Sequence, residues 1–323
     1  SRQKSLKAWA DHEPPIPEFV DHVVQVVGLS GLRKPLTDET VHRAGIFGKL
    51  SDLKDGELIT IDALTKVLLH ENGGLKNIPP GARNSVLLNQ ADDPESQSIA
   101  RTMVDSLFHH YQSVIISSLK NKVVHAVHEP TAGIVLAAGE SSRYGEPKQI
   151  LKWKGTPFVR VIAQKALRAG LSPVIVVTGA HAEQVKIAVQ DLDVKVMHNE
   201  EWKDGQGSSI RAGVSHIPQE CGSAIFLLAD QPQVSMSILH ALKEKHAEKL
   251  YPIVAPMVID RRANPVLFDR AAFSDLMTIE GDTGGRAIFH KHRVEYLPWH
   301  DESLLLDVDT PEQYQRLISN GDL

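Results

Sequence analysis

Small and positively charged residues follow a short apolar segment near the middle of the chain. Residues 132–136 (AGIVL) indicate a buried strand, and the loop 137–148 after it contains Gly139, Arg143 and Lys148. Small residues let backbone N–H groups approach phosphate oxygens, Arg143 can donate to two oxygens at once, and Lys148 adds a second positive charge. We therefore expect this loop to bind a nucleoside triphosphate. A glycine-serine surface turn with two solvated charges is the alternative, and the spacing directly after a strand disfavours it.

Acidic residues end two further apolar segments. Asp230 follows residues 224–228 (AIFLL), and Asp307 and Asp309 follow an apolar triplet. If residues 305–309 are extended, Asp307 and Asp309 share a face, because side chains two apart in a strand point the same way. A carboxylate at the end of a strand that faces a triphosphate loop is well placed to hold Mg2+. We expect a magnesium site at Asp230, with Asp309 and Asp307 as further carboxylates; a simple turn residue is the alternative for each.

A third loop precedes a predicted helix. The sequence WKDGQGSSIRAG places Gly205, Ser208 and Ser209 before a helix expected to begin near Ser208. N–H groups at such a helix N-terminus can bind an anion or the polar edge of a base. Turns rich in arginine and glycine at 261–267 and 281–286 add cations. Each of these patterns alone is common on protein surfaces.

Composition and missing motifs exclude several classes of protein. The formal charge of the 323 residues is -5, which disfavours binding to nucleic acid or to an anionic membrane. A single cysteine, Cys221, excludes an intramolecular disulfide, and the sixteen histidines show no spacing typical of a zinc site. No apolar run approaches ~20 residues and no signal peptide is visible, so we expect a cytoplasmic protein. Neither G-x-x-x-x-G-K-[ST] nor G-x-G-x-x-G occurs, which disfavours a kinase-type P-loop and a hydride-transfer enzyme.

Strands and helices alternate along the chain, with a join near residues 128–131. We expect a smaller α/β domain over 1–128 and a second domain over 129–323, with a mostly parallel sheet covered by helices on both faces. Ligands collect at the carboxyl ends of parallel strands, so Gly139, Gly205 and Asp230 should lie near one another. The expected strands are 21–28, 85–88, 114–117, 123–127, 132–136, 174–178, 194–198 and 224–228. The expected helices are 61–70, 99–109, 157–169, 182–189, one from about 208, and one from Pro311 capped by Thr310.

Six loops occur in one order: LAAGESSRYGEPK, NEEWKDGQGSSIRAG, LLADQP, RRANPVLF, EGDTGGR and LLDVDTPEQY. From about residue 132 to 317, they resemble the molybdenum cofactor cytidylyltransferase family. The resemblance implies a Rossmann-like nucleotidyltransferase fold that uses Mg2+ to transfer CMP from CTP to molybdopterin, giving molybdopterin cytosine dinucleotide and pyrophosphate. It also implies a molybdenum hydroxylase as client.

The family's functional residues can be carried over by position. The nucleotide-binding residues are then Ala137, Ala138, Gly139, Arg143 and Lys148. From the first and third loops themselves we add Leu136, Gly205, Ser208 and Ser209. The catalytic residues are Arg143, Lys148 and Asp230, and the metal ligands are Asp230, Asp309 and Asp307. The residues on the pterin side are Asn264, Pro265, Gly281, Asp282, Gly284 and Arg286.

The start of the nucleotide loop bears on the choice of nucleotide. The related guanylyltransferases usually read Leu-Ala-Gly-Gly there, so Ala138 favours cytidine. Guanylyl transfer to the same pterin and nucleotidylyl transfer to a sugar phosphate remain alternatives. A non-catalytic carrier or chaperone for the molybdenum cofactor is a third.

The first segment resembles another family, the accessory proteins of selenium-dependent molybdenum hydroxylases. The resemblance is carried by residues 10–17 (ADHEPPIP), 34–36 (KPL), 73–76 (GGLK) and 87–92 (LLNQAD). It implies a partial α/β domain like that of P-loop NTPases. The glycine-rich phosphate loop of that family is missing, and we expect natural sequence upstream of Ser1.

Overall fold

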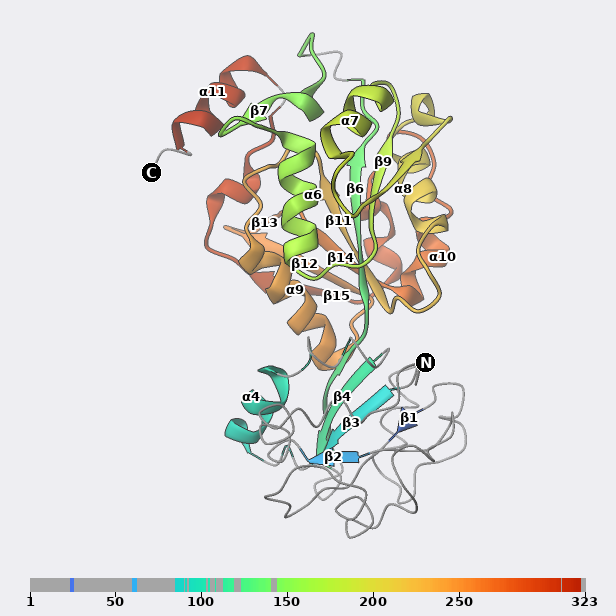
Figure 1. The fold of residues 1–323 in the computed structure, drawn as a ribbon, viewed down its shortest axis with the longest axis vertical. Coiled ribbons are helices and arrows are strands. Elements are labelled where there is room, and N and C mark those ends of the chain that lie inside the picture. The colour runs from blue at the N-terminus through green and yellow to red at the C-terminus, as the bar shows by residue number, and fades with distance from the viewer. Residues whose placement is uncertain are drawn as a thin grey trace. The chain divides into compact units, whose positions relative to one another are not determined.

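The structure is a computed structural model in which the chain divides into two units. One unit is Ser1–Glu129 with Ala247–Leu250, and the other is Pro130–His246 with Tyr251–Leu323. The structure describes residues 24–25, 60–62, 85–89, 91, 93–102, 104, 108, 113–118, 123–140, 144–308 and 310–320. Each unit is described by itself below (Figure 1).

The described part of the first unit contains a five-stranded sheet. Its strands are β1 (Val24–Gln25), β2 (Thr60–Asp62), β3 (Ser85–Asn89), β4 (Ser113–Ser118) and β5 (Val123–His128). Strand β3 pairs in parallel with β1, β2 and β4, and β5 runs antiparallel to β4. The strands predicted from 85, 114 and 123 onwards are confirmed, as is the described part of the strand predicted over 21–28.

Two helix predictions in the first unit need correction. The helix predicted over 61–70 begins in what is strand β2, where β-branched Thr60 and Ile61 pair with β3. The helix predicted over 99–109 begins earlier, as α4 (Pro94–Thr102). Pro94 occupies the first helical position, where its missing N–H costs no hydrogen bond. The proline was the signal for the true helix start.

The second unit contains a larger sheet. Its strands are β6 (Thr131–Ala137), β9 (Val174–Thr178), β10 (Lys195–His198), β11 (Ser223–Leu228), β12 (Ile253–Val258), β13 (Arg261–Arg262), β14 (Val266–Asp269) and β15 (Val294–Pro298). Among the described residues they follow the order β10-β9-β6-β11-β14-β12-β13, and β15 also pairs with β12. The pairs from β10 to β11 and the pair β12–β15 are parallel, while β14 and β13 run antiparallel to their neighbours. The predicted α/β fold with a mostly parallel sheet is confirmed.

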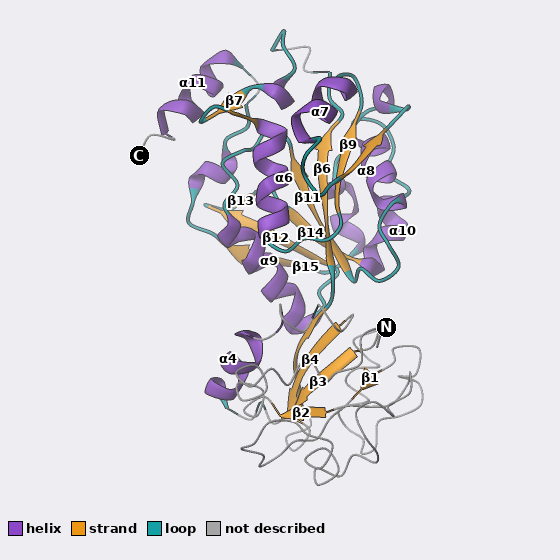
Figure 2. Ribbon diagram, viewed as in Figure 1, coloured by secondary structure: helices purple, strands orange, loops and turns teal. Residues whose placement is uncertain are grey.

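Helices cover both faces of this sheet (Figure 2). The α-helices are α6 (Phe158–Arg168), α7 (Ala182–Val189), α8 (Gln206–Ser215), α9 (Met236–Lys249), α10 (Phe273–Leu276) and α11 (Pro311–Asn320). The 3-10 helices are Lys148–Ile150, Trp202–Asp204, Arg270–Ala272, Gly285–Lys291 and Glu302–Leu305. A short hairpin is formed by β7 (Lys152–Trp153) and β8 (Thr156–Pro157).

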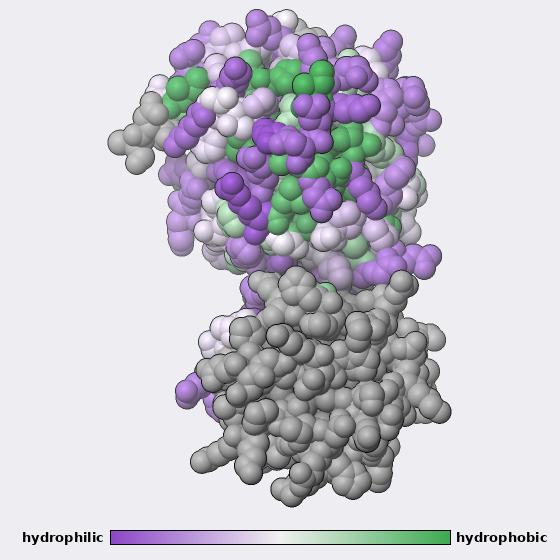
Figure 3. Space-filling view, in the orientation of Figure 1, coloured by the Kyte–Doolittle hydropathy of each residue, from purple (hydrophilic) through white to green (hydrophobic). Residues whose placement is uncertain are grey.

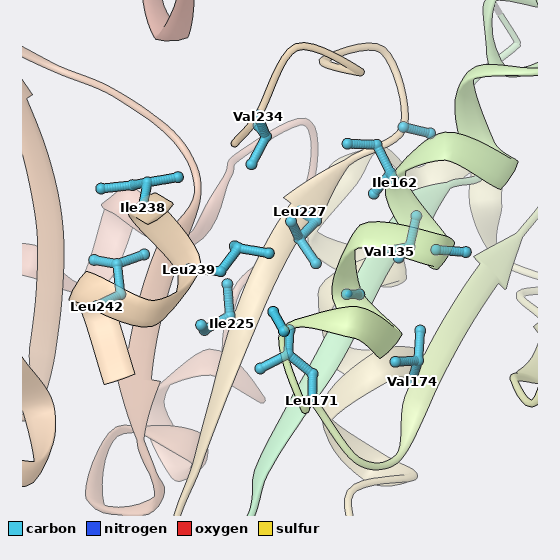
Figure 4. Close-up of a cluster of buried hydrophobic side chains, with 14 of the residues drawn as sticks. Val135, Ile162, Leu171, Val174, Ile225, Leu227, Val234, Ile238, Leu239 and Leu242 are labelled. Carbon is cyan, nitrogen blue, oxygen red and sulfur yellow. The ribbon is translucent and has the colours of Figure 1, made fainter. Parts of the chain in front are cut away.

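Strand β6 shows why such segments form the centre of the sheet. Ile134 and Val135 are fully buried but belong to opposite hydrophobic clusters, because successive side chains in a strand point to opposite faces. Val135 belongs to the cluster that includes residues of α6, α7 and α9, and Figure 4 shows it beside Ile162 of α6, whereas Ile134 belongs to the cluster with residues of α8 and α10. A strand buried on both faces must be apolar throughout. Truncation of fully buried Ile162 to alanine is expected to cost ~2–5 kcal/mol.

Two helix predictions in the second unit are confirmed at their ends. Helix α7 has the predicted bounds, and α11 begins at Pro311 as predicted. The Gln313 N–H donates to the Thr310 hydroxyl at 3.3 Å, and the Thr310 N–H donates to the Gln313 side chain at 2.9 Å, which is a capping box. Helix α8 begins at Gln206, slightly before the predicted start near Ser208.

The surface of the second unit is mixed in character. Figure 3 shows hydrophilic side chains over much of its visible face, with hydrophobic side chains between them. Ile187 and Ile259 are the most exposed large hydrophobic side chains among the described residues, at 62% and 67%. Within the described part of the chain, no helix is long and apolar enough to cross a membrane.

Candidate functional site

The candidate site begins where the neighbouring parallel strands β6 and β11 end. Leu136 of β6 is in register with Leu228 of β11, and the Ala229 N–H donates to the Leu136 carbonyl at 3.1 Å. The loops that follow the two strands therefore leave the sheet side by side (Figure 1). Gly139 lies on one of them and Asp230 on the other.

The loop after β6 returns to its own beginning and reaches the loop after β11. In the 3-10 helix Lys148–Ile150, the Gln149 side-chain amide donates to the Gly139 carbonyl at 2.6 Å and is 4% exposed. Lys148 Nζ lies 3.0 Å from Asp230 Oδ2, across 82 residues of sequence. Both charged side chains are largely covered, with exposures of 16% and 25%. The sequence-predicted cation and carboxylate thus meet, while Arg143 lies outside the described residues.

A cavity of about 760 Å³ opens over this ion pair. Its predicted lining residues are Leu136, Ala138, Gly139, Lys148, Gly205, Ser209, Asp230 and Asp282. Its other lining residues are Glu140, Tyr144, Gln149, Trp202, Lys203, Gln206, Leu228 and Ala229. The sequence analysis assigned no role to these residues. Trp202, Lys203 and Gln206 nevertheless lie in the glycine-rich loop WKDGQGSSIRAG, which is a candidate binding loop. The volume is within the range typical of sites for small molecules.

The residue that follows strand β9 lies directly against two residues that line the cavity, Ala138 and Trp202. A Cβ on Gly179, directly after β9, would lie 2.6 Å from the Ala138 carbonyl and 2.7 Å from Trp202 Cβ. The Ala180 N–H donates to that same carbonyl at 3.2 Å. Only glycine at this position lets the loop of Ala138 and the segment of Trp202 approach each other so closely.

The N-terminus of helix α8 forms another part of the cavity wall. The Gly207 N–H donates to the Gly281 carbonyl at 2.9 Å, and the Gln206 N–H faces Asp282 Oδ1 at 3.4 Å. These two first-turn donors are therefore used within the protein, while Gly205, Gln206 and Ser209 line the cavity. Gly205 has a φ of 91°, which favours glycine.

Two of the predicted nucleotide-binding residues lie behind the cavity wall. Ser208 is 2% exposed, donates to the Gly205 carbonyl at 2.8 Å and accepts from the Asn199 amide at 2.8 Å. Ala137 is 2% exposed and belongs to the hydrophobic cluster with α6. Neither lines the cavity, whereas Ser209, which also accepts from Asn199 at 3.1 Å, does.

The C-terminal acidic segment follows a short 3-10 helix. Residues 302–305 form this helix, and the Asp301 side chain accepts from the Ser303 N–H at 2.9 Å at its start. Leu306 after it has extended backbone angles, so Leu305 departs from the extended arrangement considered from the sequence and Leu306 does not. Asp307 accepts from the Gln231 amide at 2.6 Å, next to Asp230 in sequence. Asp309 lies outside the described residues, so its pairing with Asp307 stays a prediction.

The donor atoms near Asp230 fit an ion that takes few protein ligands. No group of three His, Cys, Asp or Glu side chains is arranged to hold a metal within the described residues. Mg2+ usually binds one or two carboxylates together with substrate phosphates and water. The partly exposed carboxylate of Asp230 on the wall of a large cavity suits that mode and does not suit a structural zinc site.

The residues predicted for the pterin side are only partly brought to the cavity. Asp282 lines it, and Gly281 contacts the start of α8. Arg286 donates to the Arg262 carbonyl at 3.1 Å, and burial together with the Arg262 guanidinium lowers the pKa of Arg286 below its usual value. Asp307 acts in the opposite direction on that pKa. Asn264, Pro265, Gly284 and Arg286 do not line the cavity.

Comparison with known proteins identifies the second unit. Residues 133–296, just over half of the chain, match the MobA-like NTP transferase domain. The chain belongs to the MobA-like NTP transferase family. Residues 1–45 match a different family, the YqeC protein, and that match lies almost wholly outside the described residues.

Two proteins that are similar in sequence to this MobA-like chain have quite different names. One is "Nicotine blue oxidoreductase" of Paenarthrobacter nicotinovorans, 31% identical over 199 residues that cover 58% of this chain and 95% of that protein. The other is "Probable molybdenum cofactor guanylyltransferase" of Bacillus mycoides strain KBAB4, 31% identical over 206 residues that cover 58% and 98%.

A solved structure shares the fold of the MobA-like unit. The crystal structure of Rv0371c from Mycobacterium tuberculosis H37Rv has a TM-score of 0.53 and 29% identity, and covers 59% of this chain and 98% of that chain. A further structure of Rv0371c is described as a complex with manganese; its TM-score is 0.50, its identity 27%, and its coverage 59% and 98%.

Proposed function

We propose that the chain transfers a nucleotidyl group, with CTP as the donor, to a molybdopterin-type cofactor and releases pyrophosphate. The observation that carries the proposal is the pairing of Lys148 with Asp230 on the wall of one large cavity, beside the Gly139 loop. A triphosphate needs cations for its oxygens and a carboxylate for its accompanying metal ion. Family membership and the names of the molybdenum cofactor guanylyltransferases support the same class of reaction.

The residues of the cavity have distinct tasks in this proposal. The backbone around Ala138 and Gly139 approaches the triphosphate, while Trp202 and Gln206 lie on the wall available to the base or sugar. Lys148 binds phosphate oxygens, and Asp230, with Asp309 and Asp307 as further carboxylates, holds Mg2+. Bound Mg2+ supplies Lewis-acid charge stabilisation at the phosphate oxygens. Arg143 is the second phosphate-binding cation.

The chain's own groups then favour in-line transfer by position and charge. The terminal phosphate of the pterin attacks the α-phosphorus of CTP, the bond to the β-phosphate oxygen breaks, and pyrophosphate leaves. Lys148 and Arg143 stabilise the negative charge that develops on the departing pyrophosphate. No general base is needed when the attacking phosphate is already ionised. Most of the acceleration in such reactions comes from orientation and electrostatic stabilisation.

The choice between CTP and GTP rests on different observations. Ala138 in the sequence Leu136-Ala137-Ala138-Gly139 supports CTP through the family resemblance. The names of relatives such as the Bacillus mycoides protein support GTP instead. Guanylyl transfer to the same pterin is therefore the second candidate function.

One experiment separates these functions. The protein is incubated with molybdopterin, Mg2+ and each of the four nucleoside triphosphates, and the dinucleotide and pyrophosphate are identified. Formation of molybdopterin cytosine dinucleotide with CTP is the expected result, and the guanine dinucleotide would establish the second candidate. Tight molybdopterin binding without any pyrophosphate would establish a carrier. In a parallel incubation, sugar 1-phosphates replace molybdopterin, and turnover with them alone would reject the pterin as acceptor.

A further inference from the structure

Lys165 of α6 places a positive charge in a half-buried position beside the turn that carries Asp230. Its Nζ donates to the Pro232 carbonyl at 2.6 Å, across 67 residues of sequence, and lies 4.6 Å from the centre of the Trp153 indole. Cations over the face of an indole are attracted by its π electrons. Lys165 therefore joins three elements: α6, the β7–β8 hairpin and the turn after β11.

The hairpin links Trp153 to the segment of Lys148. Its two turn residues, Lys154 and Gly155, have φ values of 50° and 81°, as a two-residue type I′ turn requires. The Phe158 N–H donates to the Leu151 carbonyl at 2.8 Å and closes the hairpin directly after the 3-10 helix of Lys148. Figure 1 shows β7 beside the first turns of α6. A shift of Trp153 is therefore transmitted over a few residues to Lys148.

The turn on the other side is equally short. Pro232 lies two residues after Asp230, the Gln231 N–H donates to the Leu228 carbonyl at 3.2 Å, and the Val234 N–H donates to the Gln231 carbonyl at 3.2 Å. These hydrogen bonds connect Pro232 closely to the residues around Asp230. The contact of Lys165 with the Pro232 carbonyl therefore constrains the position of Asp230.

The charge is held here at a cost. Burial, together with the nearby Lys154 ammonium, lowers the pKa of Lys165 to about 8. A neutral side chain of similar length would be easier to bury, because desolvation disfavours the charged form. Ionisable groups whose pKa is shifted by burial and by a nearby charge are common at functional sites.

We propose that Lys165 is a positioning residue whose ammonium fixes the separation between the turn of Asp230 and the hairpin behind Lys148. The inference rests on the proposed function, because it assumes that Asp230 and Lys148 hold a divalent ion and a triphosphate. Lys165 touches neither ligand in this arrangement. It keeps Asp230 in the orientation that binds the ion.

The two effects of the Lys165 proton have opposite pH dependence. As pH rises through about 8, the folded protein loses the ammonium, and the remaining amine bonds Pro232 more weakly because charge-assisted hydrogen bonds are roughly twice as strong as neutral ones. Between about 8 and the ordinary value of 10.5, the unfolded chain binds more protons than the folded one, so this group's contribution to stability increases with pH. Over the same pH range, metal binding should weaken while the contribution of Lys165 to the free energy of unfolding increases.

The charged groups around Lys165 are consistent with this assignment. Lys154 on the hairpin favours loss of the proton, Asp230 on the turn is paired with Lys148, and neither Trp153 nor Pro232 titrates in this range. The pH response of the contact is therefore expected to be that of Lys165 itself.

The test measures Mn2+ alone, by water proton relaxation, on the full chain and its variants under argon. Asp230→Asn defines the signal that does not come from the site. At about pH 7, Lys165→Met should bind Mn2+ ~10-fold or more weakly than wild type, a typical loss when a residue supporting a metal ligand is changed. Its melting temperature should be at least that of wild type. Lys165→Arg should bind like wild type and keep its affinity at about pH 9, where wild type approaches Lys165→Met.

The outcomes separate the two proposals. If Lys165 acted on the site only through its positive charge, its loss would tighten Mn2+ binding. Equal or tighter binding by Lys165→Met therefore overturns the positioning role. A lower melting temperature of Lys165→Met together with unchanged Mn2+ affinity shows a purely structural contact and also overturns it. If wild type binds Mn2+ no better than Asp230→Asn, the metal assignment within the proposed function fails first, and the role of Lys165 fails with it. Tryptophan emission of the wild type should change with pH around about pH 8. Loss of this change in Lys165→Met, with Trp153→Phe as control, would independently show that Lys165 titrates beside Trp153.

Discussion

The two walls of the cavity are built by different kinds of interaction. The charged wall, Gly139, Lys148 and Asp230, is held by an ion pair between loops that follow adjacent parallel strands. The packed wall, Gly205 and Asp282 with the start of α8, is held by backbone hydrogen bonds and very close packing. The charged wall has side chains that can change partners when a ligand enters. The packed wall has a fixed shape.

This difference indicates a division of labour. In the charged wall, Lys148 can exchange Asp230 for phosphate oxygens without moving the backbone. In the packed wall, a Cβ on Gly205 would lie 2.5 Å from Asp282 N, so the wall has no room to adjust. We therefore expect changes in the charged wall to affect turnover and changes in the packed wall to affect stability and fit.

The largest effect is expected from Asp230→Asn. The amide keeps the shape of the side chain but removes the charge that holds Mg2+, so kcat should fall about 10³-fold, near the top of the range for loss of one charge-stabilising group. Pyrophosphate release with CTP and molybdopterin measures it. Asp275→Asn is the matched control, because Asp275 also pairs with a lysine, Lys291, at 2.8 Å, but outside the cavity. Equal losses of kcat in the two variants would show that the charged wall has no specific role in catalysis.

Lys148→Ala is expected to lose about 10²-fold in turnover, because phosphate oxygens lose a positive partner. Mn2+ alone should bind Lys148→Ala at least as tightly as wild type, since Asp230 is then relieved of its competing ammonium. Calorimetric titration with Mn2+ and the pyrophosphate assay give the two numbers. Lys291→Ala serves as the control on the surface pair. Weaker Mn2+ binding by Lys148→Ala would mean that the lysine orients the carboxylate and does not merely neutralise it.

The packed wall can be tested with Gly205→Ala. The added Cβ meets Gly281 and Asp282 at 2.5 Å, and the φ of 91° is unfavourable for alanine, so a loss of about 1–3 kcal/mol in the free energy of unfolding is expected. KM for the nucleotide should rise more than kcat falls. Gly145→Ala isolates the backbone term, because Gly145 has a φ of 82° but nothing within 4 Å of an added Cβ. Urea denaturation measures both variants, and equal losses would show that steric contact at α8 is unimportant.

The sequence predicts the charged wall better than the packed wall for a physical reason. Apolar segments that end abruptly in Gly139 or Asp230 reveal strand ends, and parallel pairing then brings those ends together. The packed wall depends on contacts such as that of Gly207 with Gly281, whose register no local pattern reveals. The contact between Lys165 and Pro232 could not be predicted either, because the position of Lys165 in a helix does not indicate what its side chain reaches.

Local capping signals determine two turns near the C-terminus. Thr310 and Gln313 form the capping box that starts α11 at the predicted residue. Asp301 starts a 3-10 turn in a similar way, and the sequence analysis did not predict this turn. The roles of Arg143 and Asp309 stay predictions, because both lie outside the described residues.

The smallest effect is expected from Ala138→Gly, which tests whether one methyl group influences the choice of base. Ala138 is 5% exposed, and its Cβ would lie 2.9 Å from a Cβ on Gly179, so its methyl group fills a narrow space between the ends of β6 and β9. One methyl group in a pocket changes discrimination between ligands by roughly 1–3 kcal/mol, or about 10–200-fold. The ratio of kcat/KM for CTP to that for GTP should therefore fall by about tenfold, the lower end of that range, with little change in melting temperature. Ala180→Gly, next to Gly179, is the control for added backbone freedom. If Ala138→Gly leaves the ratio unchanged, the base is selected elsewhere, and Trp202 and Gln206 on the packed side of the cavity become the residues to exchange.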